Sequence, residues 1–200
     1  MKSLNRSTAT AAAVLAMAAT FTVGSAAVLS GPAMAQGKRE KTKMVGGAAM
    51  YPSKNIVANA VNSKDHTTLV AAVKAAGLVD TLSGAGPFTV FAPTNEAFDK
   101  LPSDTVPTLL KPENKPTLVK VLTYHVVPGR LTAKDLMGLV KKGNGKAILT
   151  TVQGGKLTVT SKGKTVTVTD AKGGMSHVTI ADVLQSNGVI HVVDTVLMPG

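Results

Sequence analysis

Four histidines and one serine–histidine pair are the side chains of this chain whose types could support catalysis. The histidines have neither the HxxH nor the HExxH spacing of zinc hydrolases, because they are widely separated: His66, His125, His177 and His191. Ser176 directly precedes His177, but neighbouring side chains of a strand point to opposite faces, so this pair lacks dyad geometry. The sequence therefore predicts neither a metal centre nor a nucleophilic triad.

Two weaker patterns also fail as catalytic signals. The segment Gly163-Lys164-Thr165 resembles the end of a phosphate loop, yet Thr158 stands where the first glycine should be. Glu96 and Asp99 are close in sequence, but they have the pattern of exposed residues on a short helix. We expect no cofactor and no enzyme activity.

The charge of the chain is strongly basic. It has 22 lysines and arginines against 11 acidic residues, and all but Arg6, Arg39 and Arg130 are lysines. Nucleic-acid readers favour arginine forks and aromatic stacking, whereas this chain has two tyrosines, four phenylalanines and no tryptophan. Nucleic acid is therefore not an expected partner. Dispersed lysines favour acidic partners such as anionic glycans.

Residues 1–35 are predicted to be a cleaved secretory signal peptide. Lys2 and Arg6 precede an apolar stretch over 9–28, and Ala33-Met34-Ala35 fits a signal-peptidase site. A membrane anchor is the alternative, but the stretch is mostly alanine and threonine. Cleavage would leave a cysteine-free chain of net charge +9, because only Lys2 and Arg6 are charged before residue 36. We expect a secreted protein, extracellular or periplasmic, with no membrane span in the mature chain.

The remaining sequence indicates a flexible basic tail over 36–51 and one domain over 52–200. Apolar residues follow helical spacing in the first half and alternate in the second, which favours an α+β fold. Expected helix caps are Ser53 or Asn55, Asp65, Thr94 and Thr132. Strands are expected at 88–92, 147–152, 156–160, 164–169, 177–180, 189–193 and 195–198.

Three segments together resemble the fasciclin domain family: FTVFAPTNEAF at 88–98, LTYHVVPG at 122–129 and NGVIHVVDTVLMP at 187–199. The resemblance covers about 52–199. It implies a fasciclin-like β-wedge or sandwich with several short helices packed around it. It also implies a secreted, non-catalytic cell-adhesion module whose partner is a cell-surface or matrix protein or an anionic glycan, with self-association as a further interaction.

The resemblance also implies candidate interaction residues. The family's Tyr-His pair is Tyr124-His125 here, which is either an adhesion determinant or, as the residue types favour, a buried aromatic beside a backbone-bonded histidine. A stretch tied to integrin binding in animal members aligns with Asp182, Val183 and Leu184, although its preceding residues differ here. The mainly structural motif residues are Thr94, Asn95, Asn187, Gly188, His191 and Asp194.

An alternative function is that of a carrier for an apolar small molecule. Some fasciclin-like proteins bind carotenoids or other lipids, so the resemblance admits this function too. The residues expected to line such a site are Leu136, Met137 and Leu139. Each of them is equally well explained as part of the hydrophobic core.

Overall fold

The structure is a computed structural model that describes residues 41–200. The predicted signal peptide, 1–35, and the start of the predicted tail, 36–40, lie outside the described residues. The family resemblance and the α+β class both concern the described part of the chain.

A seven-stranded sheet forms the centre of the domain, in the order β4-β3-β9-β8-β7-β6-β5. The central strands β3 and β9 run parallel, and all other neighbours in the sheet are antiparallel. The sheet nearly closes, because the Val152 N–H beyond β5 donates to the Val126 carbonyl of β4 at 2.8 Å. The strands are β3 (Phe88–Pro93), β4 (Val126–Pro128), β5 (Lys146–Thr150), β6 (Lys156–Lys162), β7 (Thr165–Thr169), β8 (Met175–Gln185) and β9 (Gly188–Val193).

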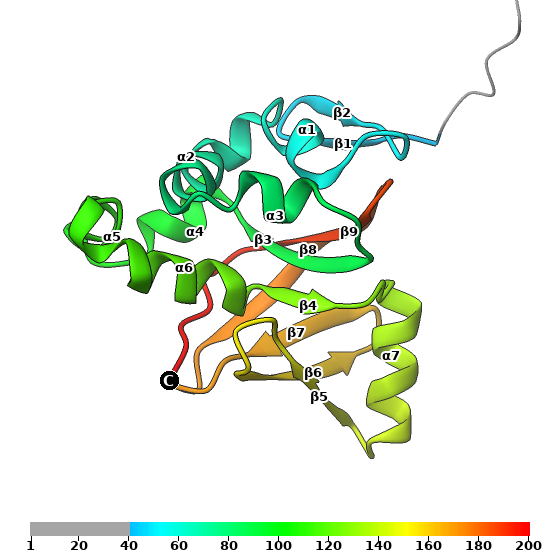
Figure 1. Ribbon diagram of the computed structural model, residues 1–200. Coiled ribbons are helices and arrows are strands. Elements are labelled where there is room, and N and C mark those ends of the chain that lie inside the picture. The colour runs from blue at the N-terminus through cyan, green and yellow to red at the C-terminus, as the bar shows by residue number, and fades with distance from the viewer. Residues whose placement is uncertain (1–40) are drawn as a thin grey trace, which may run out of the picture. The chain divides into compact units, whose positions relative to one another are not determined.

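Short helices pack around this sheet, so the predicted α+β class is confirmed. Figure 1 shows α1 to α6 grouped on one side of β3 and β9, with α7 beside β5 and β6. The helices are α1 (Ile56–Ala60), α2 (Thr67–Ala76), α3 (Val79–Ser83), α4 (Asn95–Asp99), α5 (Thr105–Leu109), α6 (Lys115–Tyr124) and α7 (Ala133–Lys142), with 3₁₀ turns η1 (Lys64–His66) and η2 (Pro112–Asn114).

Local capping explains where several helices begin. Asn55 accepts from the Ala58 N–H and Thr94 from the Ala97 N–H, and Thr132 forms a capping box with Asp135. The predicted cap at Asp65 is wrong, because that residue lies within η1 and α2 starts at Thr67.

The folded part of the chain begins at a lower residue number than the sequence indicated. Residues 43–50, predicted as flexible, form a hairpin of β1 (Lys43–Val45) and β2 (Ala48–Met50). Gly46 and Gly47 have φ of 56° and 75°, which suits the tight turn of a hairpin. Val45 and Met50 are buried against the helices, and this tertiary contact holds a segment too short to be stable alone.

Two hydrophobic cores lie on the two sides of the central strands. The first joins the hairpin and α1, α2, α4 and α6 to residues of β3, β8 and β9. The second lies within the curved sheet and includes Phe91, Tyr124, Leu136 and Leu157. The predicted last strand at 195–198 is absent, but Val196 and Leu197 are buried in these cores.

Candidate functional site

Tyr124 ends helix α6 inside the second core and has no exposed surface. Its hydroxyl donates to the Lys156 carbonyl at 2.7 Å and accepts from the Ala171 N–H at 3.0 Å. Gly155 lies against the ring so closely that a Cβ there would come within 2.6 Å of it. Tyr124 thus ties α6 to the strand β6 and to the loop after β7.

His125 is buried beside it and bonded at both ring nitrogens. Nδ1 lies 2.9 Å from the Val121 carbonyl, and Nε2 accepts from the Leu197 N–H at 3.0 Å. These partners require a neutral ring with its proton on Nδ1. Burial lowers the pKa of His125 from 6.5 to about 4. The imidazole therefore anchors the C-terminal segment to α6 and presents nothing to solvent.

His191 of β9 links Asp182 to the start of α7. Its Nδ1 accepts from the Asp182 N–H at 3.3 Å, and its Nε2 donates to the Leu131 carbonyl at 2.8 Å. Phe91 stacks on the ring with centroids 5.7 Å apart. Burial lowers the pKa of His191, so this ring is also neutral at pH 7.

Asp182 occupies an irregularity of strand β8 with a left-handed backbone, φ 54°. Its Oδ1 accepts from the N–H of Ala133, the first residue of α7, at 2.7 Å. Of the next two residues, Val183 is buried, at 1% exposed, and Leu184 is exposed, at 37%. Of the five candidate interaction residues, Asp182 and Leu184 are therefore the two with accessible side-chain surface, because Tyr124, His125 and Val183 are buried.

The remaining motif residues join segments. Asn95 accepts from the Thr68 N–H at 3.0 Å and donates to the Lys64 carbonyl at 2.8 Å, which connects α4 to α2 and η1. Asp194 accepts from the His177 N–H at 2.8 Å and from the Thr195 hydroxyl at 3.1 Å. Gly188 must lack a side chain, since a Cβ would lie 2.1 Å from the Phe88 carbonyl oxygen.

Asn187 makes three hydrogen bonds between distant segments, and we expect Asn187→Ala to lower the free energy of unfolding by about 2 kcal/mol. Oδ1 accepts from the Ile56 N–H at 3.0 Å, and Nδ2 donates to Leu82 and Gly84 carbonyls at 2.8 and 3.0 Å. Urea unfolding measures the effect. Asn62→Ala is the matched control, because exposed Asn62 makes one local bond. A loss for Asn187→Ala no larger than that of the control would contradict the structural role.

The groups that could support catalysis are not arranged for it. Ser176 is buried and donates to the Thr195 carbonyl at 2.8 Å, while exposed His177 pairs with Asp194 at 3.4 Å. Within residues 41–200, no three histidine or acidic side chains come together in a way that could hold a metal ion. In the same residues, no helix is both long and apolar enough to cross a membrane.

The described residues thus form an α+β module in which histidine, asparagine and aspartate side chains hold the segments together. Residues 64–199 match the sequence model of the fasciclin domain. The chain belongs to the fasciclin domain family, a family of non-catalytic modules, which confirms the resemblance of its three motifs and the expectation that it is no enzyme.

Relatives and a solved structure agree with this family. Protein sll1483 of Synechocystis sp. is 48% identical over 161 residues, covering 80% of this chain and 82% of that protein. Cell surface glycolipoprotein MPB83 of Mycobacterium bovis is 39% identical over 122 residues, or 61% of this chain and 48% of that protein. A fasciclin domain pair from the insect cell adhesion molecule Fasciclin I has the same fold, with a TM-score of 0.66, 21% identity and coverage of 74% of this chain and 52% of the pair.

Proposed function

We propose that this protein is exported and acts outside the cytoplasm as a module that binds a protein at a cell surface or in a matrix. The observation that carries the proposal is the fasciclin domain, which accounts for most of the described chain. Fasciclin domains are associated with adhesion and surface roles: one relative is a cell surface glycolipoprotein, and the solved fasciclin domain pair comes from a cell adhesion molecule. The signal-peptide pattern of 1–35 supports export.

The contact surface that we propose is centred on Asp182 and Leu184. The left-handed backbone at Asp182 breaks the regular strand and leaves its carboxylate partly exposed, although one oxygen caps α7. Leu184 adds an exposed apolar side chain two residues further along β8. Protein interfaces have an apolar core and a polar rim, and in this surface Leu184 would belong to the core and Asp182 to the rim.

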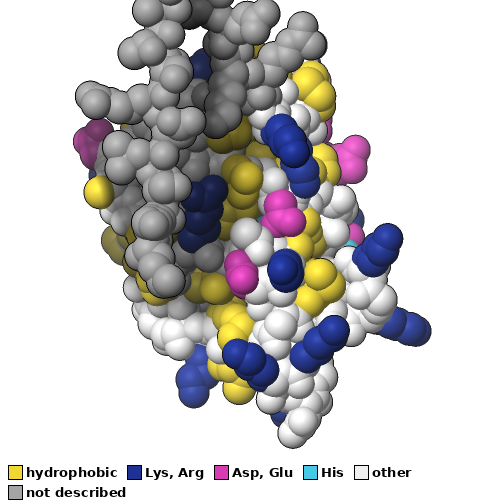
Figure 2. Space-filling view, turned by 90° about the vertical axis from the view of Figure 1, so that its right-hand side faces the viewer, with side chains coloured by type: hydrophobic (Ala, Val, Ile, Leu, Met, Phe, Trp, Pro, Cys, Tyr) yellow, Lys and Arg dark blue, Asp and Glu magenta, His cyan; other side chains and the backbone are white. Residues whose placement is uncertain are grey.

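The lysines supply a weaker, general attraction. Figure 2 shows them dispersed among acidic and apolar side chains on one face of the molecule. Dispersed surface charges attract a polyanion in a way that salt screens. We therefore assign the lysines to long-range attraction and the specific contact to Asp182 and Leu184.

We expect Leu184→Ser to weaken binding to the protein's own cell envelope or matrix by about tenfold, since burying an apolar side chain of this size in a contact contributes about 1.5 kcal/mol or more. Asp182→Asn removes the charge but keeps an oxygen for the Ala133 N–H, and asparagine tolerates a positive φ. The affinities of both variants for the envelope or matrix are measured with labelled protein at low and high salt. Bare lipid serves as a further surface.

Met175→Ser is the matched control, because Met175 is 62% exposed at the other end of β8. Binding that survives high salt and falls with Leu184→Ser but not with Met175→Ser supports a protein partner. Binding that salt abolishes on every surface would instead assign the interaction to an anionic glycan or lipid and overturn the proposed contact surface.

A further inference from the structure

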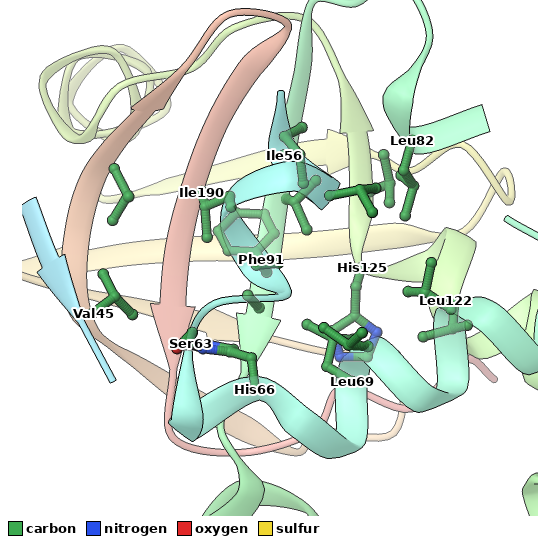
Figure 3. Close-up of a pocket in the computed structure, with 18 of the residues that line it drawn as sticks. Val45, Ile56, Ser63, His66, Leu69, Leu82, Phe91, Leu122, His125 and Ile190 are labelled. Carbon is green, nitrogen blue, oxygen red and sulfur yellow. Dashed lines mark hydrogen bonds between the residues drawn. The ribbon is translucent and has the colours of Figure 1, made fainter. Parts of the chain in front are cut away.

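The apolar cavity between the helices and the central strands is small. Figure 3 shows it between Ile56 of α1, Leu69 of α2 and Ile190 of β9, and its volume is about 50 Å³. A carotenoid or a lipid needs far more space, since an engineered cavity that holds one benzene molecule already measures about 150 Å³. Three residues expected from the sequence to line an apolar site are not part of this cavity: Leu136, Met137 and Leu139. A larger pocket is polar and shares no lining residue with it.

The polar pocket has a volume of about 480 Å³ and opens at the edge of the sheet where the parallel strands β3 and β9 begin. Its walls are the loop 83–87, which joins α3 to β3, and residues 186–188, where β8 passes into β9. Arg130, which follows β4, is the one charged side chain among the described residues that line it. The lining therefore has a positive charge with no acidic residue to neutralise it.

Close packing fixes the two loops of this pocket. The Asn187 Nδ2 donates to the carbonyls of Leu82 and Gly84 at 2.8 and 3.0 Å. A Cβ on Gly86 would lie 2.0 Å from the Asn187 carbonyl oxygen, so only glycine lets the two loops approach so closely. Because Gly84, Ala85 and Gly86 have little or no side chain, the space beside them stays open. A ligand would thus meet a preformed pocket and would pay little to order it.

The backbone on both sides of Arg130 is also held in place. The hydroxyl of Thr89, a buried residue of β3, donates to the Gly129 carbonyl at 2.7 Å and accepts from the Leu131 N–H at 2.9 Å. The Leu131 carbonyl in turn accepts from His191 Nε2 at 2.8 Å. Arg130 therefore lies between two anchored residues, and its side chain begins from a defined point at the pocket.

The pocket offers hydrogen-bond donors that the protein does not use itself. Within residues 41–200 the ion pairs involve Lys100, Lys111 and His177, and the guanidinium of Arg130 has neither an ion pair nor a hydrogen bond. In the same residues the backbone N–H groups of Ala85 and Gly86 have no hydrogen-bond partner. A guanidinium fork matches the two oxygens of a carboxylate, and neighbouring backbone N–H groups also bind anions. A carboxylate is thus the group that this lining suits.

We propose that the polar pocket binds a carboxylate of the partner protein, with its two oxygens on the Arg130 guanidinium and further hydrogen bonds from the N–H groups of Ala85 and Gly86. The pocket adjoins the proposed contact surface, because Leu184 and Ser186 are alternate exposed residues at the end of β8. An acidic residue of the partner can therefore enter the pocket while an apolar neighbour contacts Leu184. That the ligand is a protein rests on the proposed function, whereas the carboxylate site rests on the pocket alone.

Two small probes test the carboxylate site in the purified protein. N-acetylalanine carries a peptide carboxylate at pH 7, and N-acetylalanine amide has nearly the same shape without the charge. Each is titrated with NMR detection of backbone N–H and arginine Nε–H groups. We expect N-acetylalanine to shift the signals of Arg130 Nε–H and of the Ala85 and Gly86 N–H groups, and the amide to leave them in place. Glucuronate, titrated in the same way, tests an acidic sugar and should bind more weakly than N-acetylalanine.

Variants of Arg130 assign the binding to its guanidinium. Arg130→Gln should weaken the affinity for N-acetylalanine about tenfold, because hydrogen bonds to a charged group are the stronger kind. The urea midpoint should not change, since the exposed guanidinium has no partner in residues 41–200. Arg130→Lys keeps the charge but loses the fork, so it should recover only part of the affinity. Lys172→Gln is the matched control, because Lys172 is exposed and lies outside the pocket.

Three results would overturn the inference. If N-acetylalanine leaves the Arg130 Nε–H signal unshifted, or if its amide binds equally well, the pocket is not a carboxylate site. If glucuronate binds more tightly than N-acetylalanine, the ligand is an acidic sugar and not a protein. These titrations use no partner, so they are independent of the envelope assay: an envelope affinity unchanged by Leu184→Ser would overturn the contact surface but not carboxylate binding at Arg130.

Discussion

Replacing Tyr124 by alanine is expected to lower the free energy of unfolding by about 3–5 kcal/mol, the range for removing a large aromatic side chain from a core. Tyr124 is fully buried, and both bonds of its hydroxyl are to backbone groups of distant segments. Tyr124→Phe retains the ring and should cost about 1–3 kcal/mol, because the Lys156 carbonyl and the Ala171 N–H lose their partner. Urea unfolding of both variants measures the two losses.

This result bears directly on the role of the family's Tyr-His pair. Because Tyr124 has no exposed surface, we expect Tyr124→Ala to reduce partner binding only in proportion to the unfolded fraction. Tyr51→Ala is the control for removing a tyrosine from the surface instead of the core, since Tyr51 is 41% exposed. If Tyr124→Ala remained fully folded at the assay temperature and yet lost binding, the pair would act as an adhesion determinant. Until then, that role stays a prediction.

The stability of the domain is expected to fall as the pH is lowered from 6.5 towards 4. Burial lowers the pKa of His125 to about 4, whereas an unfolded histidine titrates near 6.5. Below 6.5 the unfolded chain therefore binds a proton that the folded chain does not, and the folded state loses about 3 kcal/mol by pH 4. The stabilisation is complete above the unfolded pKa. His66 and His191, whose pKa values burial also lowers, shift stability in the same direction.

Urea unfolding at several pH values between 7.5 and 4.5 tests this dependence. His125→Gln should be less stable at pH 7 but should lose less stability on acidification, since the buried titrating group is gone. Asn62→Ala should keep the slope of the unmodified protein, because Asn62 is exposed and does not titrate. A free energy of unfolding that stays constant between pH 6.5 and 4.5 would contradict neutral buried histidines.

The sequence alone determined the features that depend on neighbours along the chain. Caps at Thr94 and Thr132 follow from a side chain reaching an N–H three residues away, whereas the structure chose Asn55 over Ser53 for the first helix. The β6–β7 hairpin follows from alternating residues around a turn at Gly163, whose φ is 62°. The family motifs could also be recognised, because this chain has their residue types in the same order. Together these features were sufficient for the α+β class and the family.

The tertiary structure alone decided what each motif residue does, since its partners are far away in sequence. His125 meets the Leu197 N–H across 72 residues, and His191 meets the Leu131 carbonyl across 60. The order of the β1–β2 hairpin likewise depends on packing between separate segments. A polar residue forms an internal hydrogen bond or contacts a partner according to which segments cover it. The local sequence does not specify those segments, because they come from distant parts of the chain.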